Sequence, residues 1–252
     1  MGEGEAMVFV TGDTHGQKDL GKILPDSWPQ GYGLTRDDYL VVCGDFGGVW
    51  APGERDERVL GWWESRPWTT LFVDGNHENH DLIDSYPTVE RFGGRVQVVP
   101  GHPHVVHLMR GYVYDLPVFP GTTARCLVMG GASSPDRAWR IEGESWWDRE
   151  MPSEAEYDRC TASLEEVGWR VDYVFTHELP SDLRLGAYGW RYQDRLSQVD
   201  RIQCFLQWVW ERLDRERLVM WYAGHYHVDR MVAGKCRVLY QDVEPLGAVD
   251  GI

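Results

Sequence analysis

Basic side chains are scarce in this chain, which carries 25 lysines and arginines against 40 aspartates and glutamates, for a formal net charge of -15. Such a negative field repels phosphate polyanions, so we expect no stable binding of nucleic acid. A nucleotide substrate is not excluded, because a bound cation reverses the local field that an anion meets. The charge therefore disfavours nucleic-acid binders but not enzymes that act on small phosphate compounds.

Cysteine is also scarce. The five cysteines are odd in number and widely spaced, and they form no Cys-x-x-Cys pair. A secreted domain held together by disulfides is therefore not expected. The N-terminus lacks the basic and then apolar pattern of a signal peptide, and no apolar run approaches the roughly 20 residues that a membrane helix needs. We expect a cytoplasmic protein that has reduced thiols and does not associate with a membrane.

The chain has 252 residues, of which 42% are hydrophobic and 26% are charged, and this is ordinary globular usage. A chain of this length can bury one substantial core. The sequence contains no internal repeat, low-complexity tract or linker. We therefore expect a single domain over residues 7–252, after a loose extension over residues 1–6.

Five apolar runs end abruptly in short polar segments, and each of these segments contains a side chain that can bind a metal ion. The runs are predicted to be β-strands over Met7 to Val10, Tyr39 to Cys43, Thr69 to Val73, Val171 to Phe175 and Leu218 to Ala223. Segments of helical character lie between them, including Glu54 to Arg66 and Leu196 to Asp214. This alternation predicts parallel strands buried on both faces, with a binding site at their carboxyl ends.

Other elements are predicted from local signals. Residues 153 to 168 are expected to form a helix that begins with a capping box made by Ser153 and Glu156. Short β-rich runs predominate from residue 96 to residue 130, and residues 230 to 243 are typical of a hairpin. We therefore expect antiparallel strands in addition to the parallel ones.

The polar segments offer metal ligands at suitable spacings. Asp13 and His15 stand two apart in an extended segment, so both can point the same way toward one cation. Asp45 follows the next strand, and the two oxygens of its carboxylate can bridge two cations about 3.5 to 4 Å apart. Taken singly, each of these residues is more often an ordinary turn residue or a core histidine.

The remaining motifs are more specific. Asn76 lies in the segment Gly-Asn-His-Glu, and an amide oxygen is an unusual ligand unless charge elsewhere balances the site. His225 and His227 are again two apart after a strand, so each can send its imidazole to a different cation. His177 completes the series. The motifs Gly-Asp-x-His-Gly, Gly-Asp, Gly-Asn-His-Glu, a lone His and Gly-His-x-His would rarely occur together in this order by accident.

In these motifs and in their order, the chain resembles the calcineurin-like metallophosphoesterase family from Met7 to Leu246. The resemblance implies an α/β fold, a four-layer α/β/β/α sandwich in which two mixed sheets are flanked by helices. It also implies two divalent cations, with manganese expected and iron, zinc or nickel as alternatives. By this resemblance Asp13, His15, Asp45 and His227 bind one metal, whereas Asp45, Asn76, His177 and His225 bind the other.

The resemblance implies a hydrolase of small phosphate monoesters or diesters, nucleotides among them. A water between the two cations would be deprotonated near neutral pH and would attack phosphorus in line. His77 would not be a ligand but the general acid that protonates the leaving oxygen. Diesters are slightly favoured, because such an acid assists a poor leaving group.

The sequence departs from the motif Gly-Asp-x-x-Asp-Arg of many relatives, including the Ser/Thr protein phosphatases. It reads Gly44-Asp45-Phe46-Gly47-Gly48-Val49 instead. In those relatives the second Asp orients the catalytic His and the Arg binds the substrate phosphate, which Gly48 and Val49 cannot do. A protein phosphatase is therefore not expected, and His77 needs another partner.

The segment from Gly130 to Trp147 is the candidate source of the missing phosphate ligand. Arg137 or Arg140 can bind phosphate through the forked guanidinium group, and a tryptophan of this segment can stack on a base or ring. The alternative is an ordered surface loop whose indoles only pack.

Two other functions stay open. One is a metal-dependent nuclease of the double-strand-break-repair type, against which the acidic balance and the lack of an appended DNA-binding region count. The other is a catalytically silent scaffold with the same fold, against which the complete ligand set counts. The histidines outside the motifs are interpreted as unrelated to the metals, because their spacing mixes the two faces of a strand and no carboxylate is interleaved; they are His80, His102, His104 and His107. The sequence gives no indication of the oligomeric state.

Overall fold

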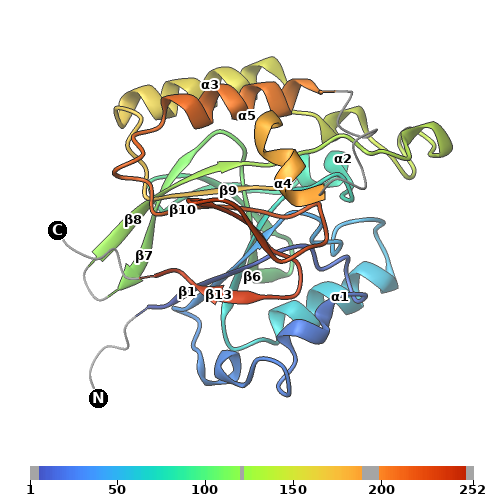
Figure 1. Cartoon of the computed structure of the whole chain (residues 1–252). Coiled ribbons are helices and arrows are strands. Elements are labelled where there is room, and N and C mark those ends of the chain that lie inside the picture. Colours follow the sequence, from blue (N-terminus) through green and yellow to red (C-terminus); the bar gives the residue numbers. More distant parts are fainter. Residues whose placement is uncertain (1–5, 120–121, 189–198, 248–252) are drawn as a thin grey trace.

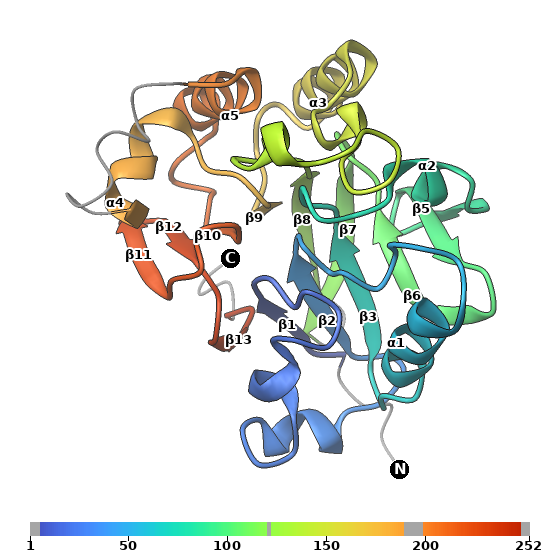
Figure 2. The same ribbon diagram turned by 90° about the vertical axis from the view of Figure 1, so that its right-hand side faces the viewer.

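The computed structural model describes residues 6–119, 122–188 and 199–247, which form two mixed β-sheets flanked by helices (Figure 1). Helices α3 (Glu154–Glu166) and α5 (Arg201–Arg212) lie over the outer face of one sheet, and α1 (Glu54–Glu64) lies against the other sheet. The second view shows α3 and α5 on one side of the molecule and α1 near β3 and β6 on the other (Figure 2). The layers thus follow the order helix, sheet, sheet, helix that the family resemblance implied.

The first sheet contains seven strands in the order β13-β1-β2-β3-β6-β5-β4. Strands β1, β2, β3 and β6 are parallel, and β13, β5 and β4 pair antiparallel with their neighbours. The strand bounds are β1 Val8–Thr11, β2 Tyr39–Cys43, β3 Thr69–Val73, β4 Thr88–Arg91, β5 Gly94–Val99, β6 His102–Leu108 and β13 Val243–Pro245.

The second sheet contains six strands in the order β11-β12-β10-β9-β8-β7. Strands β12, β10, β9 and β8 are parallel, and the two outer strands pair antiparallel. The strand bounds are β7 Val113–Phe119, β8 Thr122–Met129, β9 Tyr173–Thr176, β10 Met220–Ala223, β11 Arg230–Ala233 and β12 Cys236–Val238. The predicted hairpin is confirmed for β11 and β12, but the prediction was wrong for Val243, which pairs with β1 in the other sheet.

The helices follow their local signals. Helix α3 begins after Ser153, whose backbone N–H donates to Glu156 Oε2 at 2.7 Å, so the predicted capping box is confirmed. Helix α5 begins after Asp200, which forms a similar box with Gln203, and residues 196–198 of the predicted helix lie outside the described residues. The shorter helices are α2 (His80–Asp84) and α4 (Arg184–Tyr188), with 3-10 turns at Leu20–Ile23, Pro29–Gly33, Arg137–Trp139, Asp148–Glu150 and Ser181–Leu183.

The strands of the sheet centres are buried on both faces, which explains their continuous apolar runs. In β1, Val8 and Val10 pack between the two sheets. Phe9 points the opposite way and packs toward α1 and the first 3-10 turns, with its ring 5.0 Å from that of Trp28. This alternation along the strand gives the molecule one core between the sheets and one beneath each helical layer.

The strands that precede the candidate ligands belong to both sheets. Strands β1, β2 and β3 are parallel neighbours in the first sheet, and β9 and β10 are parallel neighbours in the second. Strands β2 and β3 have the predicted bounds, while β9 and β10 begin two residues later than predicted. Because parallel strands end on the same side, both sheets deliver their polar segments to one end of the molecule.

Three further expectations concern the extension, membrane helices and the cysteines. The predicted extension over residues 1–6 lies outside the described residues except for Ala6. Among the helices that the structure describes, none is long and apolar enough to cross a membrane. All five cysteines lie in described segments and are free.

The packing of α3 onto the second sheet is tested by two glycines with matched backbone angles. A Cβ at Gly111, where φ is +79°, would lie 2.8 Å from the Glu156 oxygen and 2.9 Å from the Cys160 nitrogen of α3. Gly101 has a φ of +80° but open space around it. We expect Gly101→Ala to cost about 1 to 2 kcal/mol through backbone strain. Gly111→Ala should cost a further ~1 to 3 kcal/mol, because α3 must shift. Urea denaturation measures both, and equal losses would contradict the tight packing of α3.

Candidate metal centre

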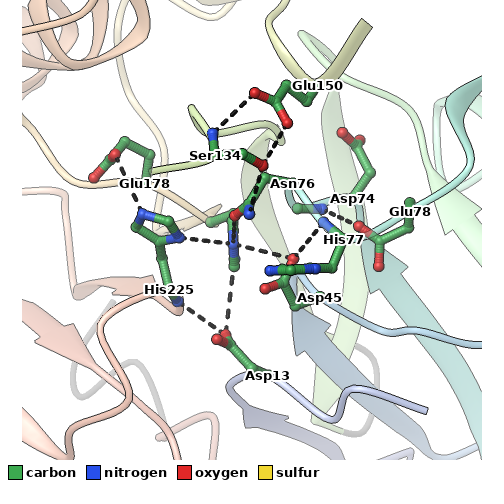
Figure 3. Close-up of polar contacts among 12 residues, drawn as sticks. Asp13, Asp45, Asp74, Asn76, His77, Glu78, Ser134, Glu150, Glu178 and His225 are labelled. Atoms are coloured by element: carbon green, nitrogen blue, oxygen red, sulfur yellow. Dashed lines mark hydrogen bonds and ion pairs between the residues drawn. The ribbon is translucent and has the colours of Figure 1, made fainter. Parts of the chain in front are cut away.

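Side chains that follow strands of both sheets meet at one place, as Asp13, Asp45, Asn76 and His225 show (Figure 3). The structure brings together three groups whose possible ligand atoms lie within 4.8 Å of one another. These groups are Asp13, His15 and His227; Asp13, Asp45 and His177; and His15, Asp45 and His77. Residues that are far apart in the sequence but belong to the metal-binding motifs are thus neighbours in the fold.

Asp45 lies at the middle of the cluster and is 2% exposed. Its Oδ2 atom is 3.2 Å from His15 Nε2, and its Oδ1 atom is 3.3 Å from His177 Nε2. The backbone N–H of His77 donates to Oδ1 at 2.8 Å. The two carboxylate oxygens therefore face histidines from different sheets, which is the arrangement that a bridging carboxylate requires.

Asp13 occupies one side of the cluster and is fully buried. Its Oδ1 atom accepts the backbone N–H of His225 at 2.9 Å. Its Oδ2 atom pairs with His227 Nε2 at 3.0 Å, but it accepts no hydrogen bond of regular geometry among the described residues. Such an oxygen is costly unless a cation faces it, so Asp13 fits a metal ligand.

His177 occupies the other side and is also fully buried. Its Nδ1–H donates to the carbonyl of Cys43 at 3.0 Å, which leaves Nε2 directed at the cluster. This Nε2 atom lies 3.1 Å from Asn76 Oδ1 and 3.2 Å from His225 Nδ1. The amide nitrogen of Asn76 donates to Ser134 Oγ at 3.1 Å (Figure 3). This hydrogen bond fixes the amide oxygen toward His177.

Backbone strain is concentrated at these positions. Six non-glycine residues among those described have a positive φ, and four of them are candidate ligands: His15, Asp45, His225 and His227. L-residues adopt this conformation at a cost of order 1 to 3 kcal/mol, and folds retain it mainly at functional sites. The strain is therefore an indication of function that does not depend on the motifs.

The glycines of the motifs make room for ligands from other strands. A Cβ at Gly75 would lie 2.2 Å from Asp45 Oδ1, and a Cβ at Gly224 would lie 2.2 Å from Asp13 Oδ1. The neighbouring carboxylates occupy the space that any larger residue would need. Glu78, at the end of the same motif as Gly75, holds two of the loops by accepting the N–H groups of Gly75 at 2.6 Å and Gly47 at 3.1 Å.

The charges of the cluster compensate one another. Burial by itself raises the pKa of Asp13 and Asp45, but the nearby histidines, His177 foremost, lower both values below the usual one. Burial lowers the pKa of His15, but Asp45, and then Asp13, raise it to about 9. The metal-free protein thus has ionised carboxylates beside a protonated His15 at neutral pH, and a cation that binds here must displace protons.

His77 lies at the edge of the cluster beside Arg140, which the sequence proposed as a phosphate ligand. Arg140 Nη2 is 3.1 Å from His77 Nε2 and 3.2 Å from Nδ1, and Asp136 holds the same guanidinium group at 2.8 Å. The His77 ring nitrogens thus lie beside an arginine and not beside the carboxylate that the family resemblance implied for many relatives. Burial, only partly offset by Asp45, lowers the pKa of His77 to about 4, and Arg140 contributes to this shift.

Arg137 is placed differently. Its guanidinium carbon lies 3.8 Å from the centre of the Trp146 ring, and its side chain is 58% exposed. Trp146 and Trp147 are buried in the fold, whereas Trp139 is 90% exposed. Of the two arginines considered for phosphate, only Arg140 contacts a residue of the cluster in the described structure.

The histidines outside the motifs have other partners. His102 lies 3.3 Å from Glu57, His104 pairs with Glu64, and His107 lies 2.9 Å from Asp74. The possible ligand groups found among the described residues contain none of these histidines and do not contain His80.

Several residues that contact the candidate ligands were missed by sequence reasoning. Asp19 lies 2.7 Å from His15 Nδ1, and its position four residues after His15 was the available signal. Glu178 Oε2 lies 3.9 Å from His225 Nε2 and directly follows His177 in the sequence. Glu150 does not contact a ligand itself but accepts a hydrogen bond at 2.6 Å from the hydroxyl of Ser134, the partner of Asn76, and no local pattern indicated this contact.

A cavity of about 460 Å³ borders the cluster. This volume is in the range of small-molecule sites. One part of its wall consists of candidate ligands and His77, and the rest is contributed by Pro135, Ala187, Tyr188, Tyr226 and Val228.

Comparison with known proteins gives one family match. The family model described as calcineurin-like phosphoesterase matches residues 6–229, a range that contains every candidate ligand. Among curated proteins no match was found. The crystal structure of a protein of unknown function, AQ665 from Aquifex aeolicus, is similar at 17% identity over 69% of this chain and 80% of that chain, with a TM-score of 0.27.

Asp45→Asn is expected to reduce metal binding more than any other single change in the cluster, because both oxygens of Asp45 face candidate ligands. The loss should exceed the ~10- to 100-fold that follows removal of an outer hydrogen-bond partner. Asp38→Asn is the matched control, since Asp38 is buried at the start of β2 and accepts the N–H groups of Met7 and Thr35. Metal analysis after reconstitution and dialysis measures both variants. Tight retention of two metals by the Asp45 variant would contradict a bridging role.

Proposed function

The chain belongs to the calcineurin-like phosphoesterase family, and on this premise we propose that it hydrolyses small phosphate esters with two divalent metal ions. The placement of Asp45 is the observation that carries the proposal, because its two oxygens face His15 and His177 from different sheets. A cluster of buried carboxylates and strained histidines at the carboxyl ends of parallel strands suits this chemistry.

The proposed ligand sets divide the cluster into two sites that share Asp45. One site consists of Asp13, His15, Asp45 and His227, and the other consists of Asp45, Asn76, His177 and His225. The buried Asp13 oxygen that accepts no hydrogen bond of regular geometry supports the first site, and the Asn76 oxygen directed at His177 supports the second. Mixed nitrogen and oxygen donors suit manganese, with iron, zinc and nickel as alternatives.

When bound, two such cations lower the pKa of a water molecule and neutralise charge on the phosphoryl group. The protein residues around them orient the substrate. Arg140 is the proposed phosphate ligand, since its guanidinium lies beside His77 and is held by Asp136. It thereby takes the role of the arginine that is missing after Gly48.

His77 is the proposed general acid for the leaving oxygen. Its ring lies between the candidate ligands and Arg140, and its centroid is 5.6 Å from that of His15. Beside Arg140 the free imidazole is neutral at pH 7, because its pKa is lowered to about 4. A phosphate ester bound to Arg140 brings negative charge next to the ring and raises the pKa, so substrate binding and protonation of His77 support each other.

The cavity beside the cluster is proposed to hold the organic group of the ester. Its volume of about 460 Å³ suits a small molecule, including a nucleotide. Pro135, Ala187 and Val228 contribute apolar surface to its wall, and Tyr188 and Tyr226 contribute rings that lie 4.7 Å apart. A sugar or a base can pack against such a surface.

We also propose a cytoplasmic location.

A substrate panel with manganese tests the proposed function. The panel contains phosphate monoesters, diesters, cyclic nucleotides, dinucleoside polyphosphates and DNA. Turnover of small esters that is lost with a chelator and restored by metal would support the proposal. Cleavage of DNA alone would favour the nuclease, and two bound metals without turnover of any substrate would favour a scaffold.

Arg140→Ala is expected to raise KM by about 10- to 100-fold while the metal content stays the same, since a charge-assisted hydrogen bond contributes about 1.5 to 3 kcal/mol. Arg137→Ala is the matched control from the same loop, because its guanidinium packs over Trp146. Steady-state kinetics on the best ester of the panel compares the two. An Arg140 variant that matches the parent enzyme would show that this loop does not bind phosphate.

His77→Ala is expected to lower the rate of hydrolysis by a factor that depends on the basicity of the leaving group. A nitrophenolate departs readily as an anion, so little activity should be lost with it. With an alkoxide or ribose oxygen the loss should approach the lower end of the ~10² to 10⁴ typical of general acid catalysis, because no carboxylate orients this histidine as in many relatives.

Metal content is measured on the same His77 variant. We expect it to equal that of the parent enzyme. Equal losses for all leaving groups would show instead that His77 binds the phosphoryl group, and a loss of metal would make His77 a ligand.

A further inference from the structure

Three side chains outside the proposed ligand set support one of the two metal sites. They are Asp19, Lys22 and Tyr240. Tyr240 contacts both of the others, and each of the three contacts one of the residues that belong to this site alone. Those residues are Asp13, His15 and His227. Asp19 and Lys22 follow β1, whereas Tyr240 follows β12 in the second sheet.

Asp19 fixes the ring of His15. Its Oδ2 atom lies 2.7 Å from His15 Nδ1, so the carboxylate accepts the Nδ1–H. The other ring nitrogen, Nε2, then faces Asp45 Oδ2 at 3.2 Å. A carboxylate that holds one nitrogen of a histidine sets both the tautomer and the direction of the other nitrogen. Asp19 therefore directs Nε2 of His15 at the cluster, where this nitrogen can bind a cation once its proton is displaced.

Tyr240 joins Asp19 to His227. Its hydroxyl donates to Asp19 Oδ1 at 2.9 Å, and its ring stacks on that of His227 with centroids 4.7 Å apart and an angle of 18° between the planes. The side chain of His227 is 49% exposed, whereas the other candidate ligands are at most 15% exposed. The stacked ring limits the rotation of an imidazole that has little other packing.

Lys22 fixes the backbone next to Asp13. Its Nζ atom donates to the carbonyl oxygens of Gly12 at 3.0 Å and Asp13 at 2.7 Å, and also to the carbonyl oxygen of Tyr240. An ammonium group has three donors, so all of them are engaged. Lys22 is buried and thus ties the segment after β1 to the segment that carries Tyr240.

The residues of the other metal site have separate partners. Asn76 is held by Ser134, which is held by Glu150. The His177 ring is held by the carbonyl of Cys43, and His225 faces Glu178. In the contacts that the structure describes, Asp19, Lys22 and Tyr240 are therefore not among the residues that hold Asn76, His177 and His225.

We propose that Asp19, Lys22 and Tyr240 are positioning residues for the Asp13, His15 and His227 metal site, and that this site can be weakened without the other. The inference rests on the proposed two-metal function. It adds that each metal has its own supporting residues, so the two affinities can be changed separately although the sites share Asp45 and are joined by the hydrogen bond from the His225 N–H to Asp13.

The test compares four variants by calorimetric titration with Mn²⁺ and by ¹¹³Cd NMR, which gives a separate resonance for each site. Asp19→Ala should weaken one site by about 10- to 100-fold and leave the other unchanged. Asp19→Asn keeps an acceptor at the same place and should lose less. Tyr240→Phe keeps the stacked ring but not the hydroxyl, so its loss should be smaller than that of Asp19→Ala. Asp26→Ala, at an exposed carboxylate of the same segment, should bind both metals as the parent protein does.

Two further readouts separate positioning from general damage. At a pH above the His15 pKa of about 9, where the ring is neutral, the ¹⁵N shifts of His15 in the metal-free protein should show the Nδ1–H tautomer in the parent and lose it in Asp19→Ala. The melting temperature of the metal-free variants shows whether they are folded. Unchanged affinity at both sites, or equal weakening of both, in a folded Asp19→Ala variant would overturn the inference while the two-metal function stands. A parent protein that binds no metal would overturn the proposed function and this inference with it.

Discussion

The carboxylate of Asp45 is the constraint on which the rest of the site depends. It is buried between two sheets, and an isolated carboxylate in such a place would be strongly destabilised. His15 approaches one of its oxygens and His177 approaches the other, and the histidine charges lower its pKa in spite of burial. The carboxyl ends of the strands in the two sheets must therefore lie beside each other at a fixed distance. The core between the sheets, in which Val10 and Val41 pack against residues of the second sheet, maintains that separation.

This geometry explains why the sequence predicts the site well. Strand ends, glycines and ligand types are all local features, so the motifs around Asp13, Asp45 and Asn76 could be read without the fold. The glycines are required because ligands from other strands fill the space of their Cβ atoms, as Gly75 and Gly224 show. The fold class followed from the family resemblance, and β2 and β3 were predicted to the residue because they are buried on both faces.

The contacts that could not be predicted join segments that are distant in the sequence. Tyr240 lies 221 residues from Asp19. Their hydrogen bond depends on how the segment after β12 in one sheet lies relative to the segment after β1 in the other. For the same reason, the sequence could not show which of Arg137 and Arg140 lies beside the candidate site. Both arginines follow the same strand at a similar distance, and only the path of the loop places one beside His77 and the other over Trp146. The pairing of Val243 with β1 likewise joins the first and the last strand that the structure describes.

The acidic character of the chain and a phosphate substrate are compatible if the site has its own charge. The proposed ligands include two carboxylates, from Asp13 and Asp45, and the others are an amide and imidazoles that bind metal in the neutral form. Two divalent cations carry more positive charge than these carboxylates cancel, so the occupied site is locally positive, and Arg140 adds to this field. The net charge of -15 then repels polyanions from most of the surface, while a small ester that reaches the cavity meets a field of the opposite sign. On this argument the same charge distribution that disfavours DNA favours compact substrates with few phosphate groups.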